Sequence, residues 1–178
     1  MRSPTPVLFG LVAALAVTCA TPASAQLAVA QIKDSSGKPI ADANFTQTPA
    51  GVLIRLDIKG LPAGERAFHI HAVGKCEAPF TSAGPHFNPG GHKHGMMAGQ
   101  AHAGDMPNLH IPQSGELSIQ VLNGAVTLEK GKPNSLLKEE GTALVIHAKA
   151  DDYKTDPAGD AGDRIACGVV TESGQAPK

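Results

Sequence analysis

The 178-residue sequence lacks an excess of charge of either sign, any sustained helical periodicity, and any long apolar run beyond its first 25 residues. Its 15 lysines and arginines nearly balance 16 aspartates and glutamates, for a formal net charge of −1 at pH 7. The basic footprint of a nucleic-acid-binding domain is therefore missing. After residue 25, no apolar run approaches the roughly 20 residues that span a bilayer as a helix. We therefore expect no nucleic-acid partner and no membrane span in the folded part of the chain.

The first 25 residues have the features of a cleaved secretory signal peptide. Arg2 supplies a positive charge, residues 7–20 form an uncharged apolar run, and Ala23-Ser24-Ala25 is a small-x-small cleavage site. Cleavage before Gln26 would leave residues 26–178 as a single domain. A membrane anchor is one alternative. A lipid-modified Cys19 is another, although the preceding residues lack the leucine and the small residue expected there.

Cysteine is scarce, and only Cys76 and Cys167 remain once residues 1–25 are removed. An even number of cysteines in an exported chain favours one disulfide, with two separate thiols as the alternative. The bond would close a loop of about 90 residues. In the chain-entropy model, such a loop stabilises the fold by roughly 4–5 kcal/mol.

Short runs of β-forming residues, separated by clusters of glycine, proline, asparagine and serine, predict strands. The runs are residues 27–32, 52–58, 67–71, 117–121, 143–147 and 165–170. No internal repeat and no linker interrupts them. Short strands with regular turns favour an antiparallel sandwich or barrel, that is, one all-β domain.

Residues 76–114 show almost no strand pattern and are rich in glycine, proline, histidine and asparagine. A structureless loop of this length argues against a compact domain unless the loop is functional. Ordering its backbone costs about 1–2 kcal/mol per residue. A metal ion and a disulfide would offset that cost. Residues 150–163, rich in glycine and aspartate, form a second loop without a pattern.

Histidine carries the most information, because all eight histidines fall between residues 68 and 148. His69 and His71 are two apart in a predicted strand, so both imidazoles leave the same face. His147 ends another apolar strand and adds a third nitrogen. Three imidazoles on rigid strands suit copper. A surface pair and a satisfied buried histidine are the alternative interpretations.

The long loop supplies a second set of donors, namely His86, His94, His102 and Asp105. Three imidazoles and one carboxylate suit tetrahedral zinc. His102 and Asp105 are three residues apart with a glycine between them, so a tight turn can bring both to one ion. A loose metal-scavenging loop is the alternative. It is disfavoured once the strand histidines and the two cysteines are counted with the loop.

These motifs resemble copper,zinc superoxide dismutase in its bacterial secreted form, from about Gln31 to Val170. The resemblance implies an all-β, eight-stranded antiparallel Greek-key sandwich or flattened barrel with long metal-binding and active-site loops. It rests on Phe68-His69-Ile70-His71, Gly84-Pro85-His86-Phe87-Asn88-Pro89, Lys93-His94-Gly95, residues 141–152 and Arg164-Ile165-Ala166-Cys167-Gly168.

The resemblance also implies a role for each site residue. Asp151 corresponds to an outer carboxylate that links a copper ligand, His69, to a zinc ligand, His94. Arg164 corresponds to the arginine that receives the anionic substrate, and Cys76 and Cys167 to the family disulfide. The implied copper ligands are His69, His71, His86 and His147, and the implied zinc ligands are His86, His94, His102 and Asp105, with His86 as a bridging imidazolate.

The implied reaction is the disproportionation of superoxide to oxygen and hydrogen peroxide, with copper cycling between Cu(II) and Cu(I). Zinc would be structural and would hold His86. A periplasmic metal-binding protein without turnover is the alternative function. A zinc-stabilised structural module is a third, against which His147 argues. We expect a periplasmic enzyme whose partner is the superoxide anion, with a homodimer left open.

Some positions depart from the family pattern. Ala72 follows the histidine pair where the family often has a glutamate, and Arg66 stands where a histidine is common. The loop after Asp151 is short and has no obvious pair of acidic guide residues, which leaves the steering of substrate open. His92 and His110 match no ligand. Solvated loop positions are the first interpretation of both, and an accessory metal contact is the second for His92.

Overall fold

The structure is a computed structural model that describes residues 27–97 and 99–174. This part of the chain holds nine strands and one 3-10 helix, with no α-helix and no helix long and apolar enough to cross a membrane. The predicted signal peptide and Cys19 lie outside the described residues. The elements are β1 (Leu27–Asp34), β2 (Pro39–Thr48), β3 (Gly51–Lys59), β4 (Gly64–Arg66), β5 (Phe68–His71), η1 (Thr81–Ala83), β6 (Leu109–Ile111), β7 (Glu116–Asn123), β8 (Thr142–His147) and β9 (Arg164–Glu172).

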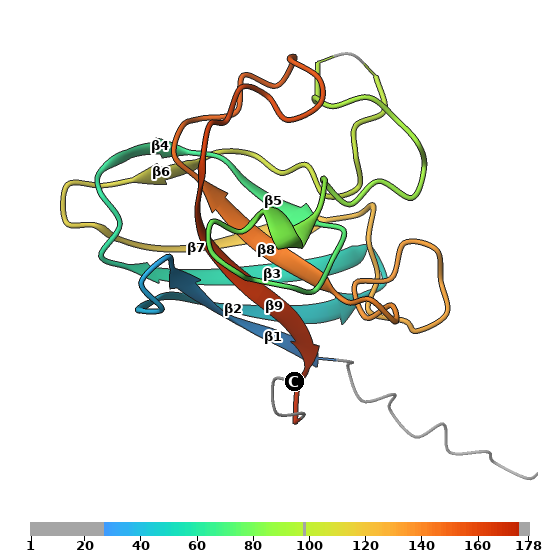
Figure 1. Ribbon diagram of the computed structural model, residues 1–178. Helices are drawn as coiled ribbons and strands as arrows, with labels where there is room; N and C mark the ends of the chain where they lie inside the picture. The colour runs from blue at the N-terminus through green and yellow to red at the C-terminus, as the bar shows by residue number, and fades with distance from the viewer. Residues whose placement is uncertain (1–26, 98, 175–178) are drawn as a thin grey trace, which may run out of the picture.

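Seven strands form one curled antiparallel sheet in the order β5-β8-β9-β1-β2-β3-β7, and β4 pairs with β6 in a separate ribbon (Figure 1). The turn between β2 and β3 is tight, with Thr48 opposite Gly51 in the register. Gly51 has φ +124°, and a Cβ there would overlap the carbonyl group of Asn123. Only glycine therefore fits where this turn passes the end of β7.

The all-β, antiparallel class expected from the sequence is confirmed. The six predicted runs correspond to β1, β3, β5, β7, β8 and β9, whereas β2, β4 and β6 were not predicted. β2 was missed because its sequence, PIADANFTQT, contains alanine, aspartate and asparagine, which have low β-propensity. β4 and β6 have three residues each, too few to show alternation. The described part of the chain thus has nine strands rather than eight, and residues 76–114 do contain one, β6.

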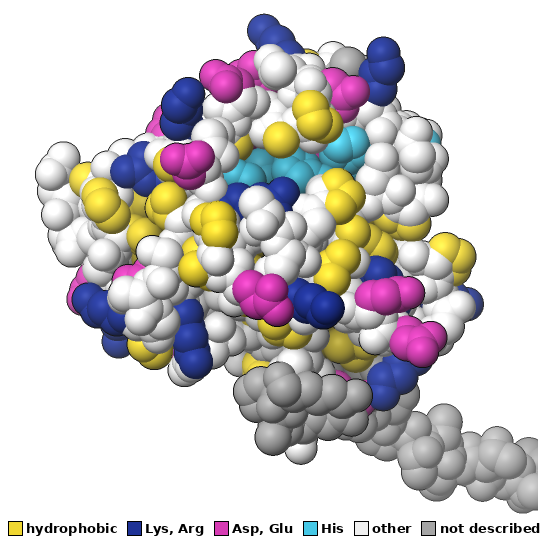
Figure 2. All heavy atoms as spheres, viewed as in Figure 1, with side chains coloured by type: hydrophobic (Ala, Val, Ile, Leu, Met, Phe, Trp, Pro, Cys, Tyr) yellow, Lys and Arg dark blue, Asp and Glu magenta, His cyan; other side chains and the backbone are white. Residues whose placement is uncertain are grey.

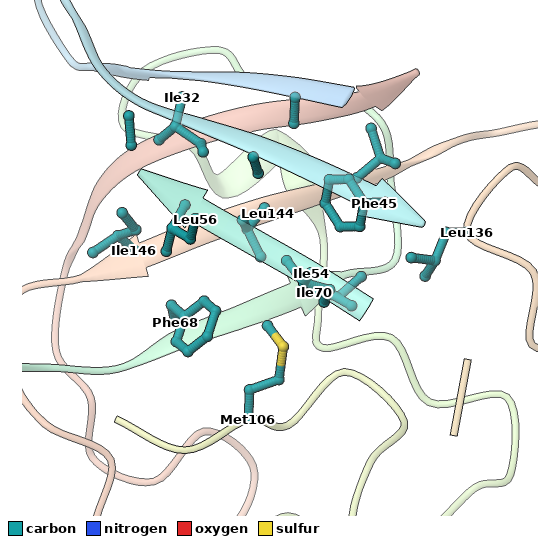
Figure 3. Packing of buried hydrophobic residues seen from close by; sticks show 14 of the residues in the cluster. Ile32, Phe45, Ile54, Leu56, Phe68, Ile70, Met106, Leu136, Leu144 and Ile146 are labelled. Carbon is teal, nitrogen blue, oxygen red and sulfur yellow. The ribbon is translucent and has the colours of Figure 1, made fainter. Parts of the chain in front are cut away.

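The core lies inside the curl of the sheet. Along β3, every second residue is buried, and the same alternation holds in β1. Figure 3 shows Phe68 and Ile70 of β5 projecting toward the same interior as Leu56 and Leu144. Each large apolar side chain buried in this way contributes about 1.5–3 kcal/mol. The core therefore anchors the strands that carry the histidines.

Strands β5 and β8 are buried on both faces, unlike β1 and β3. Their outward face is covered by the loop after β5. The two are joined by a second apolar cluster, which consists of Phe80, Ala83, Ala143, Val145 and Cys167. In the register, His69 is opposite Val145 and His71 is opposite Ala143. The two histidines therefore sit on this covered outward face, between the sheet and the loop.

The predicted disulfide between Cys76 and Cys167 is confirmed, with a Cα–Cα distance of 5.6 Å. It joins the loop after β5 to β9 across 91 positions of sequence. The alternative of two separate thiols is therefore wrong. The bond fixes the segment that precedes η1 against the sheet, directly over the outward face of β8.

Candidate metal centre

Seven predicted ligands converge beside β5 and β8. They lie under two loops, one that follows η1 and one that precedes β9. Figure 1 places the loop around residues 88–105 and the loop of residues 150–163 above β5 and β8, and the His94 amide donates to Asp156 Oδ1 between them (2.9 Å). All seven side chains are buried: His69, His71, His86, His94, His102, Asp105 and His147.

We call the first group the strand site; it consists of His69, His71, His86 and His147. One ring nitrogen from each lies within 4.8 Å of the others. His69 and His71 come from β5 and His147 from the end of β8. His86 comes from the loop, which pairs with β5 through a bridge between His71 and His86. All four rings are thus carried either by a strand or by a residue that pairs directly with one.

We call the second group the loop site; it consists of His86, His94, His102 and Asp105, again with donor atoms within 4.8 Å. Asp105 Oδ1 lies 2.8 Å from His86 Nδ1 and 3.3 Å from His102 Nδ1, and Asp105 Oδ2 lies 3.1 Å from His94 Nδ1. Three Nδ1 atoms therefore converge on one carboxylate. His86 belongs to both sites, with Nδ1 turned toward the loop site.

The carboxylate of Asp151 determines which nitrogen of two histidines is available. His69 Nε2 donates to Oδ2 and His94 Nε2 donates to Oδ1, each at 2.9 Å. Because Nε2 of each ring is used by this carboxylate, Nδ1 is the nitrogen left to face a metal ion. Asp151 thus orients one ring of the strand site and one ring of the loop site together.

Backbone carbonyl groups orient the other two rings of the strand site. His71 Nδ1 donates to the Gly84 carbonyl at 2.8 Å, and His147 Nδ1 lies 3.4 Å from the Gly162 carbonyl. The Nε2 atoms of His71 and His147 therefore face each other without protons, 3.4 Å apart. Two opposed lone pairs favour a cation beside them.

Three donor atoms of these sites are buried with no hydrogen-bond partner among the described residues: His69 Nδ1, His86 Nε2 and His94 Nδ1. His94 Nδ1 lies close to Asp105 Oδ2, but both atoms are acceptors, so this contact is not a hydrogen bond. A buried polar atom without a partner costs roughly 1–3 kcal/mol. Metal ions would satisfy all three, so the residues fit a copper ion and a zinc ion.

The protonation states also suit metal binding. Burial lowers the pKa of His71 to about 2 and that of His147 to about 3. Burial likewise lowers the pKa values of His86 and His102. For Asp151, burial acts to raise the pKa, but hydrogen bonds from His69 and His94 outweigh it and bring the value to about 2. At neutral pH, these four imidazoles are therefore neutral and the Asp151 carboxylate is ionised, as metal ligands and their supporting groups require.

Arg164, the first residue of β9, pairs with His147 after a register shift in the ladder. Its guanidinium donates to the carbonyl groups of Phe80 and Gly84, both at 2.7 Å. Burial lowers the pKa of Arg164, yet a guanidinium stays charged at neutral pH. Figure 2 shows histidine side chains at the floor of a hollow, with lysine or arginine atoms at its edge.

Sequence reasoning missed the residues that hold Asp151 in place. The Asp151 amide donates to Asn108 Oδ1 (2.8 Å), and Asn108 Nδ2 donates to the Asp151 carbonyl (2.9 Å). The Tyr153 amide donates to Asp151 Oδ1 (2.6 Å), and Gly159 lies against the same carboxylate. No spacing pattern announces these contacts, because each joins a loop to a partner that only the fold brings near.

His92 and His110 join neither site. His110 lies exposed on β6, with Nδ1 3.2 Å from Glu65 Oε1. The backbone of His92 is held by Asn88, whose Oδ1 accepts from the His92 amide and whose Nδ2 donates to the His92 carbonyl. The structure therefore separates these two histidines from the seven ligand candidates.

Two histidine-rich sites that share one imidazole, on the outward face of a curled antiparallel sheet, define a binuclear metal protein of the all-β class. The family described as copper/zinc superoxide dismutase matches residues 40–170. The chain belongs to this family, whose metals are copper and zinc.

Relatives and solved structures agree with this assignment. The chain is 57% identical over 144 residues to superoxide dismutase [Cu-Zn] 1 of Aquifex aeolicus, covering 79% of this chain and 85% of that protein. It is 39% identical over 148 residues to the Caulobacter vibrioides superoxide dismutase [Cu-Zn], covering 80% and 84%. The crystal structure of a superoxide dismutase-like protein from Bacillus subtilis superposes with a TM-score of 0.76 at 34% identity, covering 79% and 96%.

Proposed function

We propose that the protein is a copper- and zinc-dependent superoxide dismutase, which converts two superoxide anions and two protons into oxygen and hydrogen peroxide. The observation that carries this proposal is the position of His86. Its Nδ1 faces the loop site beside Asp105, while its Nε2 is buried without a hydrogen-bond partner among the described residues. One imidazole therefore has a donor atom for each of two ions. The relatives named superoxide dismutase support the same activity.

We assign copper to the strand site and zinc to the loop site. The copper ligands would be His69 Nδ1 and the Nε2 atoms of His71, His86 and His147. The zinc ligands would be the Nδ1 atoms of His86, His94 and His102, together with the Asp105 carboxylate. When bound, copper supplies one-electron chemistry between Cu(II) and Cu(I), and zinc is redox-silent.

His86 is also suited to hold a proton that the reaction needs. Its Nε2 has no competing hydrogen-bond partner among the described residues, so that atom can carry a proton when it is not a ligand. With Nδ1 held at the loop site, a proton at Nε2 would face the strand site and could pass to a basic anion there. His86 is therefore our candidate for the residue that delivers a proton to the forming peroxide.

Arg164 would hold the anionic substrate. Its two carbonyl contacts use two of the five N–H groups of a guanidinium, so the remaining donors and the full positive charge are available to a small anion. The chain carries a net negative charge, so local attraction by Arg164 must overcome general repulsion. The hydrogen bonds to the Phe80 and Gly84 carbonyl groups hold the guanidinium in position beside the strand site.

We further propose that residues 1–25 are removed as a signal peptide and that residues 26–178 form the periplasmic enzyme. The Cys76–Cys167 disulfide supports this location, because such bonds persist in oxidising compartments. Expression of the full chain, followed by fractionation and N-terminal sequencing, tests the location. A protein that begins at Gln26 in the periplasmic fraction is expected. Retention in the membrane fraction would favour the anchored alternatives.

The test of the function is metal analysis combined with direct measurement of superoxide decay. The purified protein should contain one copper and one zinc per chain, show a visible Cu(II) band, and remove superoxide. The variant His147→Ala should lose turnover but keep its fold and its zinc, because His147 belongs to the strand site alone. His110→Ala is the matched control and should be unaffected. A metal-loaded parent without turnover would instead support the metal-binding alternative.

A further inference from the structure

We call residues 72–108, between β5 and β6, the metal-binding loop. One short segment of this loop carries donor atoms that neither site uses. Residues 92–97 read His92-Lys93-His94-Gly95-Met96-Met97, in which only His94 is a zinc-ligand candidate. Met96 and Met97 are 38% and 71% exposed, which makes them two of the few large apolar side chains exposed among the described residues. The segment therefore offers an imidazole and two thioethers at the protein surface.

His92 and Met96 line the same cavity, of about 660 Å³, between the metal-binding loop and the end of β7. Met97 does not line it. His102 and Asp105 form part of the same wall, so the cavity borders the loop site. At Gly95, with φ +105°, the chain adopts a conformation that favours glycine. On either side of this residue, His94 is buried and Met96 is exposed on the cavity wall.

The position of His92 is fixed rather than free. Asn88 binds both the amide and the carbonyl of His92, at 3.0 and 2.8 Å. The ring lies against Gly90, where an added Cβ would come closest to His92 Nε2 and within 2.7 Å of His92 Cδ2. Yet the ring nitrogens of His92 have no hydrogen-bond or ion-pair partner among the described residues. A half-buried imidazole is thus held in place with its donor atoms unused.

We propose that His92 and Met96 form a third metal site, specific for Cu(I). A thioether is a soft ligand that selects Cu(I) over zinc, and an imidazole is a suitable second ligand. No lysine or arginine is among the described residues that line the cavity. The carboxylate of Asp105 already contacts His86, His94 and His102. It is therefore not free to attract an ion that prefers oxygen ligands to this cavity. The additional Cu(I) would bind whether or not the strand and loop sites turn over superoxide.

The test uses the protein already loaded with copper and zinc, reduced and kept free of oxygen. Titration with Cu(I) bicinchoninate should transfer one further Cu(I) per chain. His92→Ala and Met96→Leu should each weaken this extra binding at least tenfold, whereas the matched controls His110→Ala and Met97→Leu should not change it. Zinc content, measured in every variant, shows that the loop site is intact. X-ray absorption of the extra copper should show a sulfur ligand in the parent and none in Met96→Leu.

Three results would overturn the proposal. The first is the absence of an extra equivalent of Cu(I) in the loaded parent. The second is an extra equivalent that persists at parent affinity in Met96→Leu, because binding would then not involve the thioether. The third is equal weakening by His110→Ala and His92→Ala, which indicates unspecific binding to surface imidazoles. Met96→Leu conserves volume, so loss of binding in that variant cannot be attributed to unfolding.

Discussion

The substitution Gly159→Ala tests how strongly Asp151 couples the two metal sites. Gly159 is buried with φ +66°, and an added Cβ would overlap Asp151 Oδ1 and lie 2.5 Å from Asp151 Cγ and 2.7 Å from His94 Nε2. Real Cβ atoms essentially never come within 3.0 Å of a heavy atom outside their own residue and its two chain neighbours. The carboxylate or the loop of residues 152–163 must therefore move, and the hydrogen bonds from His69 and His94 to Asp151 must lengthen or break.

The expected magnitude has two parts. A left-handed backbone at a residue with a Cβ costs roughly 1–2 kcal/mol of stability, wherever it occurs. Loss of the hydrogen bonds that orient metal-binding histidines typically lowers metal affinity by 10–100-fold, or about 1.4–2.7 kcal/mol. We therefore expect Gly159→Ala to weaken zinc binding by 10–100-fold, beyond the general loss of stability.

Gly91→Ala separates the two effects. Gly91 lies in the metal-binding loop with the same φ, +66°, but no atom lies within 4 Å of its added Cβ. Competition with a chromophoric zinc chelator at pH 7 measures affinity, and denaturant unfolding of the metal-free proteins measures stability. Both variants should lose the stability that a left-handed backbone costs, Gly159→Ala should lose more because its Cβ overlaps Asp151, and only Gly159→Ala should lose zinc affinity. Equal zinc affinity in the two variants would refute the coupling through Asp151.

Three further predictions follow from the geometry. Reduction of Cys76–Cys167 should speed the release of zinc under native conditions, because the loop that carries His86 loses its anchor on β9; equal release rates with and without reductant would contradict this. Arg164→Glu should slow superoxide decay by 10–10³-fold with unchanged copper and zinc content, and rising salt should slow the parent but not the variant. A variant with the parent's rate and salt slope would remove Arg164 from substrate attraction. For the metal-free protein, the free energy of unfolding should be flat with pH above about 6.5 and fall below it. Between about pH 3 and 6.5, His71 and His147 bind protons in the unfolded chain but not in the folded one. Urea unfolding at pH 7.5, 6 and 5 should show a decrease of up to roughly 1.4 kcal/mol per pH unit for each histidine, and a flat profile would count against the neutral buried rings.

The sequence predicted those features that depend on local pattern. Alternation along residues 67–71 placed His69 and His71 on one face, and the structure has both side chains on the outward face of β5. Cysteine parity predicted the disulfide. The strand β2 was not predicted because Asp42 and Asn44 lower the β-propensity of its sequence, although its apolar residues are buried in the core.

The contacts around Asp151 could not be read from spacing. Asn108 is 43 positions from Asp151, and Gly159 is recognisable as essential only once its distance to the carboxylate is known. The choice of nitrogen in each imidazole is equally invisible in the sequence, because it depends on hydrogen bonds to Asp151, Gly84 and Gly162. Local pattern thus defined the candidate ligands, and long-range contacts defined their orientation.

The carbonyl group of Gly84 accepts hydrogen bonds from both His71 Nδ1 and Arg164 Nη2. A single peptide unit therefore sets the angle of a ring in the strand site and the reach of the arginine at its rim. Any displacement of residues 80–84 changes both at once. Mutations in this segment cannot adjust anion affinity and ligand alignment separately, so a variant improved in one property should be altered in the other.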